Sequence, residues 1–183
     1  MDEELFCGAI NPYSKDSIEF KQSVIEAEKL YIRIRNSSTD YLNIADRTRY
    51  SVEQILMVKH YIFFNIHQLD LSRRVEYREF DPDLSMAHSW LRLSGVNKPS
   101  SKLGTADAKG IEPHDYLLLK HELLEMKFLI DGSYDSQSEA HNVAEQEFNY
   151  LDASKEFYEK SVALQKKSTN DGDLKESHAF DNL

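Results

Sequence analysis

The chain has 183 residues, of which 40% are hydrophobic and 30% are charged, and its formal net charge is −10 at pH 7. This composition is typical of a globular protein, and the length allows one domain that buries a sizeable core. No apolar run approaches the ~20 residues that a membrane-spanning helix needs. The acidic start "MDEELFCGAI" is unlike a secretory signal, so the sequence predicts a cytoplasmic protein without a membrane partner.

Cysteine content and charge limit the function further. Cys7 is the only cysteine, which excludes an internal disulfide and a cysteine-rich zinc site. The negative net charge repels a phosphate backbone, so affinity for nucleic acid needs a local basic patch. The segment from Arg33 to Arg92 is rich in cations, and any polyanion is expected to meet it first.

Helices are predicted for most of the N-terminal half. The first occupies about residues 14–36 and is capped near Ser14 or Asp16. A short helix follows over about residues 39–47, and after a tight turn Ser51 opens a longer one. This longer helix carries the aromatic run "HYIFFNIHQL", which indicates burial.

The short and long helices match the core spacing of a helix-turn-helix, at Ile44, Ala45, Thr48, Ser51, Ile55 and Val58. Ser51 and Gln54 also have the spacing of a capping box. In a DNA-binding version of this motif, Gln54 and Arg49 are the candidate contacts. Arg49, however, stands where glycine is usual in the turn, and an arrangement used purely for packing remains the other interpretation.

Residues 74–96 give two further elements and the start of a loop. The run "RRVEYREF" predicts one short strand, and Asp83 is expected to cap a helix that extends through Leu93. Residues 94–112 collect Gly, Ser, Pro and Lys without periodicity, which predicts an exposed loop.

Two helices joined by a short turn follow this loop. Gly132 is expected to end the first of them, and Ser136 with Glu139 has the spacing of a capping box for the second. "DASKEFYEKSVALQKK" predicts one more short helix. The fold class is therefore mainly α: a helix-turn-helix-like N-terminal half packed on an antiparallel helix pair, with at most one short strand or hairpin. We expect an arm at 1–13, one domain at 14–165 and a disordered tail at 166–183.

The run "KHELLEMKFL" places ionisable side chains on the inner face of a helix. At about 100° per residue, His121, Glu122 and Glu125 lie opposite Lys120 and Lys127. If the lysines face solvent, the other three face inward or line a cleft. A buried carboxylate without a partner costs several kcal/mol, so other parts of the fold are expected to compensate them.

His141 lies at the margin of the apolar side of the next helix and is expected to converge on this face. Three interpretations remain open. The polar residues form a structural network, or they carry out acid–base catalysis without a metal, or His121, Glu125 and His141 hold a zinc ion. In the zinc interpretation Glu122 has the general-base position of an H-E-x-x-H motif, but Glu125 stands where the second histidine belongs.

In the acid–base interpretation, His121 or His141 exchanges protons and a carboxylate orients it. Arg92 or Lys59 then stabilises developing negative charge. No cofactor is needed in this case. The remaining histidines receive no role from their positions: His88 is expected on a helix surface and His114 at a helix start.

Four segments carry a resemblance to a known family: "IADRT…VKHYIFFNIH", "FDPDLSMAHSWLRL", "HDYLLLKHELLEMKFLIDG" and "EAHNVAEQEFNY". In this order they resemble the C-terminal effector domain of Gram-positive polymorphic toxins and of related Rhs-type or phage-associated proteins. The resemblance covers about Ile25 to Asp152. Arg49 departs from the family pattern, in which this turn residue is small.

The resemblance implies a bacterial effector domain that is delivered into target cells as part of a larger secreted protein and is opposed by an immunity protein. It places the polar centre of the family on His67, Arg92, His121, Glu122, Glu125 and His141. The expected activity is hydrolysis or modification of nucleic acid or of a nucleotide. The alternative is a non-enzymatic helix-turn-helix regulator or phage-associated interaction protein, in which the His/Glu network is structural.

Overall fold

The computed structural model describes residues 17–71, 74–96 and 110–160. These residues form helices and one two-stranded hairpin, which confirms the predicted mainly α fold. Within the described part of the chain, no helix is both long and apolar enough to cross a membrane. The predicted arm and tail, and residues 97–109 of the predicted loop, lie outside the described residues.

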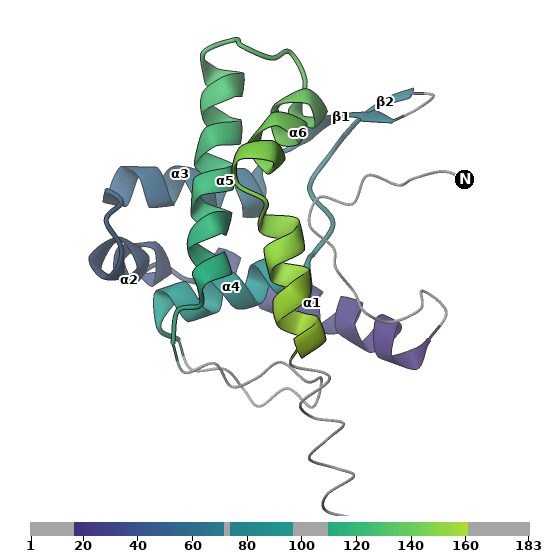
Figure 1. Cartoon of the computed structure of the whole chain (residues 1–183). Coiled ribbons are helices and arrows are strands. Elements are labelled where there is room, and N and C mark those ends of the chain that lie inside the picture. The colour runs from purple at the N-terminus through teal and green to yellow at the C-terminus, as the bar shows by residue number, and fades with distance from the viewer. Residues whose placement is uncertain (1–16, 72–73, 97–109, 161–183) are drawn as a thin grey trace, which may run out of the picture.

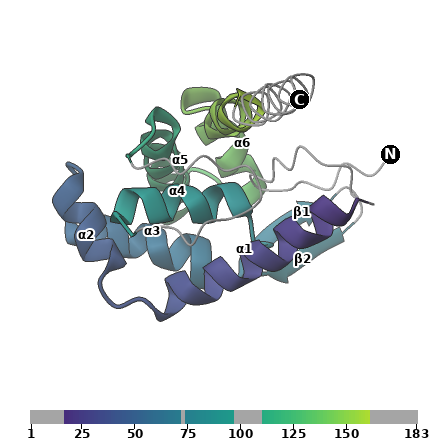
Figure 2. The ribbon, with the colours of Figure 1, turned by 90° about the horizontal axis from the view of Figure 1, so that it is seen from below.

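Helix α1 comprises Ile18–Asn36 and begins at Ser17, whose hydroxyl accepts a hydrogen bond from the Phe20 amide at 3.0 Å. The cap therefore lies one residue after the predicted Asp16. Helix α2 comprises Asp40–Arg47, in agreement with the sequence. Both helices pack against α4, Leu84–Ser94 (Figure 2).

Helix α3 comprises Val52–Phe64 and begins with the predicted capping box. Ser51 Oγ accepts from the Gln54 amide at 3.2 Å, and Gln54 Oε1 accepts from the Ser51 amide at 2.9 Å. Residues 48–51 join α2 to α3, and the two helices pack against each other. The DNA-binding form of a helix-turn-helix stays a prediction.

The chain leaves α3 into the hairpin. Strand β1 (His67–Leu71) pairs antiparallel with β2 (Arg74–Arg78), so that His67 lies opposite Arg78. The strand predicted in "RRVEYREF" is thus present, and its partner comes from "HQLDL". Figure 1 shows the hairpin at the side of the molecule, next to α6.

Helix α4 comprises Leu84–Ser94 and begins at Asp83, whose Oδ1 accepts from the Met86 amide at 2.9 Å, as predicted. At the other end, Arg47 Nη1 donates to the carbonyl oxygens of Arg92 and Leu93 at 2.9 and 2.8 Å. Gly95 follows with φ of 70°, and a Cβ there would lie 2.5 Å from the Arg47 guanidinium. Glycine is required for both reasons.

Helix α5 comprises Pro113–Ile130, and Gly132 ends it with φ of 72°, as predicted. Helix α6 (Gln137–Glu147) begins at Ser136, whose hydroxyl accepts from the Glu139 amide. It runs back beside α5, and residues 150–160 add a further helical segment on the same side (Figure 1).

Aromatic side chains from three helices meet in the core. The Tyr31 and Phe63 rings pack edge to face with centroids 4.8 Å apart, and Phe63 packs in the same way on Trp90 at 5.3 Å. All three residues are buried. Edge-to-face pairs add about 0.5–1.5 kcal/mol each beyond the area that they bury, so α1, α3 and α4 are held at a defined spacing.

Asp40 is a buried charge that links three elements. Its Oδ1 accepts from Lys59 Nζ at 2.7 Å, its Oδ2 accepts from Trp90 Nε1 at 2.7 Å, and Lys59 Nζ also donates to the Ser37 carbonyl at 2.6 Å. Asp40 and Lys59 are 2% and 3% exposed. The Lys59 ammonium group is therefore buried and paired with Asp40, so it cannot stabilise charge on a substrate. This corrects the binding role that the sequence suggested for Lys59.

Lys59→Met is expected to lower the free energy of unfolding by ~3–5 kcal/mol, because it leaves the Asp40 carboxylate buried without its cation. Urea denaturation followed by the fluorescence of Trp90, the only tryptophan in the chain, measures the change. Lys29→Met, at an exposed position of α1, is the matched control. It is expected to change the free energy of unfolding by less than about 0.5 kcal/mol. A loss below about 1 kcal/mol for Lys59→Met contradicts the structural role of this pair.

Candidate functional site

Helix α5 turns its ionisable residues inward. His121, Glu122 and Glu125 are 2%, 4% and 1% exposed, whereas Lys120 and Lys127 are exposed. The predicted opposition of the two faces is therefore present. Because buried ionisable groups need partners, the surroundings of this inner face define the candidate site.

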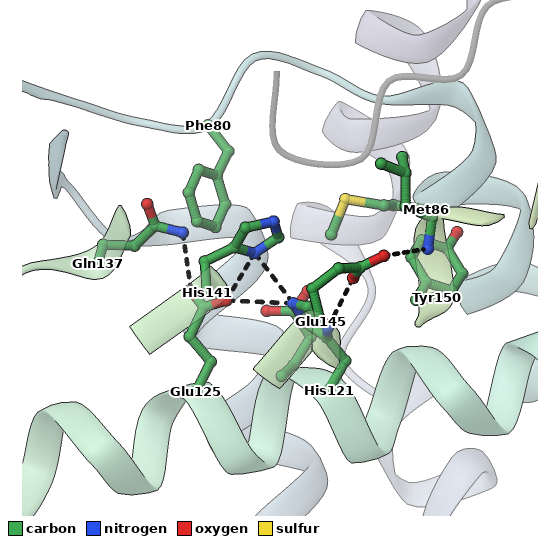
Figure 3. Close-up of a pocket in the computed structure, with 10 residues that line it drawn as sticks. Phe80, Met86, His121, Glu125, Gln137, His141, Glu145 and Tyr150 are labelled. Atoms are coloured by element: carbon green, nitrogen blue, oxygen red, sulfur yellow. Dashed lines mark hydrogen bonds and ion pairs between the residues drawn. The ribbon is translucent and has the colours of Figure 1, made fainter. Parts of the chain in front are cut away.

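Three ligating atoms converge at this face (Figure 3). His121 Nε2 lies 3.2 Å from Glu125 Oε2 and 3.0 Å from His141 Nδ1, and His141 Nδ1 lies 2.9 Å from Glu125 Oε2. Two atoms come from adjacent turns of α5 and the third from α6. The structure thus brings together the three residues that the sequence placed on facing sides of the helix pair. We call these three residues the His–Glu–His cluster.

A second layer of groups fixes the two members from α5. Glu125 Oε1 accepts hydrogen bonds from the Tyr61 hydroxyl and from Gln137 Nε2, the latter at 2.9 Å. His121 Nδ1 lies 3.2 Å from the Phe148 carbonyl oxygen and 3.1 Å from Glu145 Oε2. The orientation of both side chains is therefore set from three other parts of the fold: α3, α6 and the residue that follows α6.

The tautomer of His121 follows from these contacts. The Phe148 carbonyl oxygen and the Glu145 carboxylate are acceptors, so His121 Nδ1 carries a hydrogen. In neutral His121, Nε2 then presents a lone pair toward Glu125 Oε2 and His141 Nδ1. Two electron pairs that face each other repel. A hydrogen between these atoms, on His121 Nε2 or on His141 Nδ1, removes that repulsion, and a cation at the centre of the cluster would do the same.

Burial and hydrogen bonding shift the pKa values of this face in different directions. Burial alone lowers the pKa of His121, but hydrogen bonds to Glu125 and Glu145 outweigh it and raise the pKa to about 10. Burial raises the pKa of Glu122, and the charge of Glu125 raises it further. Burial also acts to raise the pKa of Glu125, but hydrogen bonds from His121 and His141 outweigh it and lower the pKa. The two carboxyl groups therefore take different protonation states near neutral pH.

The cluster lines a small pocket, whose wall consists of Phe80, Met86, His121, Glu122, Glu125, Gln137, His141, Glu145, Tyr150 and Leu151. The cavity volume is about 10 Å³. This is room for a single water molecule or an ion. The pocket reaches the surface beside His141 and Glu145, whose side chains are 19% and 20% exposed. An organic substrate would lie across this opening rather than inside the pocket.

Glu122 is the member of this wall with an unsatisfied atom. Its Oε2 is buried and has no hydrogen-bond partner among the described residues. An unpaired buried oxygen costs ~1–3 kcal/mol, and a water molecule or a ligand in the pocket removes that cost. The pocket therefore has a buried acceptor as well as the His–Glu–His cluster.

Arg92 belongs to a second buried cluster. Its Nε and Nη2 donate to Asp115 Oδ2 and Oδ1 at 2.9 and 2.5 Å, and Nη2 also lies 2.7 Å from His114 Nε2. The guanidinium packs over the Phe157 ring at 5.2 Å. Arg92 is thus neutralised by Asp115 and is not a wall residue of the pocket, which corrects the expectation that it reaches the face of His121 and Glu125.

Two further predicted site residues, Arg49 and Gln54, are not wall residues of the pocket. Arg49 is exposed in the turn between α2 and α3, and Gln54 closes the capping box of α3. The side chain of His67 lies outside the described part of the chain. None of these residues contributes a described contact to the His–Glu–His cluster.

Sequence reasoning missed several partners of these clusters. Glu145 received no role from the sequence, yet its carboxylate contacts His121. His88 is buried beside the Tyr158 hydroxyl at 3.2 Å, so it is not the surface histidine that was expected. His114 lies at the start of α5, as expected, but it is buried against Arg92. The one sequence signal for His114 and its neighbour was the dipeptide "HD" directly after the helix-starting Pro113.

Comparison with protein-family models, with curated proteins and with solved structures gives no significant match to this chain.

The second cluster makes stability depend on pH through His114. Burial lowers the pKa of His114 from 6.5 to about 4, and the Arg92 charge adds to this effect. The unfolded chain takes up a proton near pH 6.5 and the folded chain does not, so stability falls as the pH is lowered from about 6.5 to about 4. His114 accounts for about 2 kcal/mol of that loss between pH 7 and pH 5.

His114→Gln is expected to remove this share of the pH dependence, because Gln keeps an acceptor for Arg92 and does not titrate. Urea denaturation at pH 7 and pH 5 measures it for the wild type and the variant. His60→Gln, at an exposed position of α3, serves as the control. A His114→Gln protein that loses as much stability as the wild type between these pH values contradicts the assignment.

Proposed function

We propose that the protein is a hydrolase whose centre is the pocket formed by the His–Glu–His cluster and Glu122. One observation carries this proposal: two imidazole nitrogens and a carboxylate oxygen from two helices meet within 2.9–3.2 Å of one another at the wall of a pocket that opens to the surface. Convergent polar groups with fixed second-layer partners are typical of catalytic centres.

The reaction that fits this centre is attack by water. Ionised Glu122, whose Oε2 has no hydrogen-bond partner among the described residues, accepts one proton from a water molecule bound in the pocket. Because burial raises the pKa of Glu122, the rate should rise with pH until this carboxyl group is ionised. The water oxygen forms a bond to a carbonyl carbon of the substrate, and the positive charge at the centre of the cluster stabilises the oxyanion. The bond to the leaving nitrogen or oxygen breaks, and Glu122 passes the proton to that group.

The charge of the pocket favours an uncharged substrate bond, such as an amide or ester. Three carboxyl groups line the wall, from Glu122, Glu125 and Glu145. The nearest predicted cation for a phosphate, Arg92, is paired with Asp115. The nucleic acid or nucleotide substrate that was expected at first therefore loses its main support.

We further propose that this activity serves an effector domain. The proposal rests on the four segments that resemble polymorphic-toxin domains, and on the contacts between the helices that they form: α2 with α3 and α4, and α5 with α4 and α6. Delivery within a larger secreted protein and an immunity protein as partner belong to the same proposal. The competing regulator hypothesis is weakened because the candidate base reader, Gln54, already hydrogen bonds within its own helix start.

Glu122→Gln is expected to lower hydrolysis by at least ~100-fold, because it removes the group that accepts the proton from water. The variant should fold, since Gln has the shape of the neutral acid. The measurement combines growth of a bacterium that expresses the chain with cleavage of labelled casein and of p-nitrophenyl acetate by the purified protein. RNA, DNA and nucleoside triphosphates are tested in the same assay as substrates with phosphate bonds, and we call this set the phosphate arm.

Glu139→Gln, at an exposed position of α6, is the matched control and should behave as the wild type. Growth arrest or cleavage that Glu122→Gln abolishes supports the proposal. A wild-type protein that neither slows growth nor cleaves any of these substrates overturns it, and cleavage confined to the phosphate arm overturns the substrate class.

A further inference from the structure

The buried carboxylate of Glu125 lacks a partner with a permanent positive charge. Among the described residues, its hydrogen-bond partners are Tyr61, Gln137, His121 and His141. Glu125 is 1% exposed, and an ionised carboxylate at such a position needs a cation close by. Hydrogens on His121 Nε2 and His141 Nδ1 can each be donated to Glu125 Oε2, but a single metal ion would bind all three converging atoms at once.

The geometry points to one divalent metal ion of the zinc type, held by His121 Nε2, Glu125 Oε2 and His141 Nδ1. These atoms lie within 4.8 Å of one another, close enough to bind the same ion. The inference deepens the proposed hydrolase, on which its catalytic meaning rests. Metal binding itself is a separate property and is measured without any substrate.

Distances within the cluster match a metal site. Zinc lies about 2.0–2.2 Å from nitrogen and oxygen ligands, so two ligands of a tetrahedral ion are about 3.3 Å apart. The three separations in the cluster are 3.0, 2.9 and 3.2 Å. A single ion above the triangle engages all three lone pairs at once, after each ligand moves by a few tenths of an ångström. Two histidines and a glutamate are also an established ligand set for catalytic zinc.

The second layer has the arrangement that metal ligands require. A metal-bound histidine donates its other ring N–H to a carboxylate or a carbonyl, and His121 Nδ1 has both, in Glu145 at 3.1 Å and Phe148 at 3.2 Å. Glu125 Oε1, which is not one of the three proposed ligand atoms, accepts hydrogen bonds from Tyr61 and Gln137. Neither α5 ligand can turn away without losing these contacts.

The fourth coordination position would face the pocket. Three protein ligands leave one position open in a tetrahedral site, and the free space of about 10 Å³ accommodates one water molecule there. The buried oxygen of Glu122 lines the same pocket and has no hydrogen-bond partner among the described residues. This oxygen is the acceptor that a water molecule in the open position needs.

Metal binding by the purified full-length chain tests this inference. After treatment with a chelator, the protein is titrated with Zn²⁺ by calorimetry and with Co²⁺ by visible absorption. We expect one tight site per chain and a Co²⁺ spectrum typical of a four- or five-coordinate ion. Zn²⁺ should also raise the unfolding temperature, because it binds the folded chain in preference to the unfolded one.

Variants then separate ligands from supporting residues. His141→Ala and Glu125→Gln each remove a ligand and are expected to weaken Zn²⁺ binding by more than about 100-fold. Glu145→Gln changes only the second layer, and is expected to weaken it by about 10–100-fold while keeping the Co²⁺ spectrum. His60→Ala and Glu139→Gln, at exposed positions, are matched controls and should bind as the wild type.

His141 is the partly exposed ligand, so its Ala variant is the one that tests the site without opening the core. Absence of tight Zn²⁺ binding by the wild type, or binding that His141→Ala and Glu125→Gln leave unchanged, overturns the metal site. Glu122-dependent hydrolysis by a protein that binds no metal overturns the metal site alone. Tight binding by a protein without hydrolytic activity overturns the proposed function alone.

Discussion

The burial of ionisable side chains along α5 is the constraint on which the rest of the structure depends. Asp115 in the first turn of this helix and Glu125 in its second half are 0% and 1% exposed. An unpaired charge at either place would cost several kcal/mol, a large part of the stability of a domain of this size. Arg92 of α4 and His141 of α6 supply the partners. The order of helices around α5 is therefore fixed by pairing as much as by apolar packing.

The two clusters solve this problem differently. Asp115 is paired with Arg92, a group that stays charged at every relevant pH, so the charge of Asp115 is balanced within the protein. Glu125 is paired with His121 and His141, whose charge depends on a proton or on another cation. A cluster that needs an added cation is costly to keep for packing alone, since an apolar replacement would be as stable. The second cluster therefore points to function more strongly than the first.

Periodicity and capping rules predicted the local elements and the inner face of α5, because both depend on residues within a few positions of each other. The Asp83 and Ser51 caps and the convergence of His141 follow from such rules. The partner of Arg92 was not predicted, since Asp115 lies 23 residues further along the chain. A helical wheel identifies the buried face of a helix but not the residues that pack against it. Glu145 was not assigned to the site for a related reason: its contact with His121 joins two different helices.

The substitution of glutamate for the second histidine of an H-E-x-x-H pattern changes the architecture that the centre needs. With two histidines on one helix, the third ligand comes from further along the chain. Here Glu125 supplies an anion on α5, and the second imidazole must come from α6. The site thus exists only when α6 folds back on α5, which depends on Gly132 in the turn and on the Ser136 cap. Formation of the helix pair and formation of the centre are one event, so whatever cation occupies the cluster also stabilises the turn.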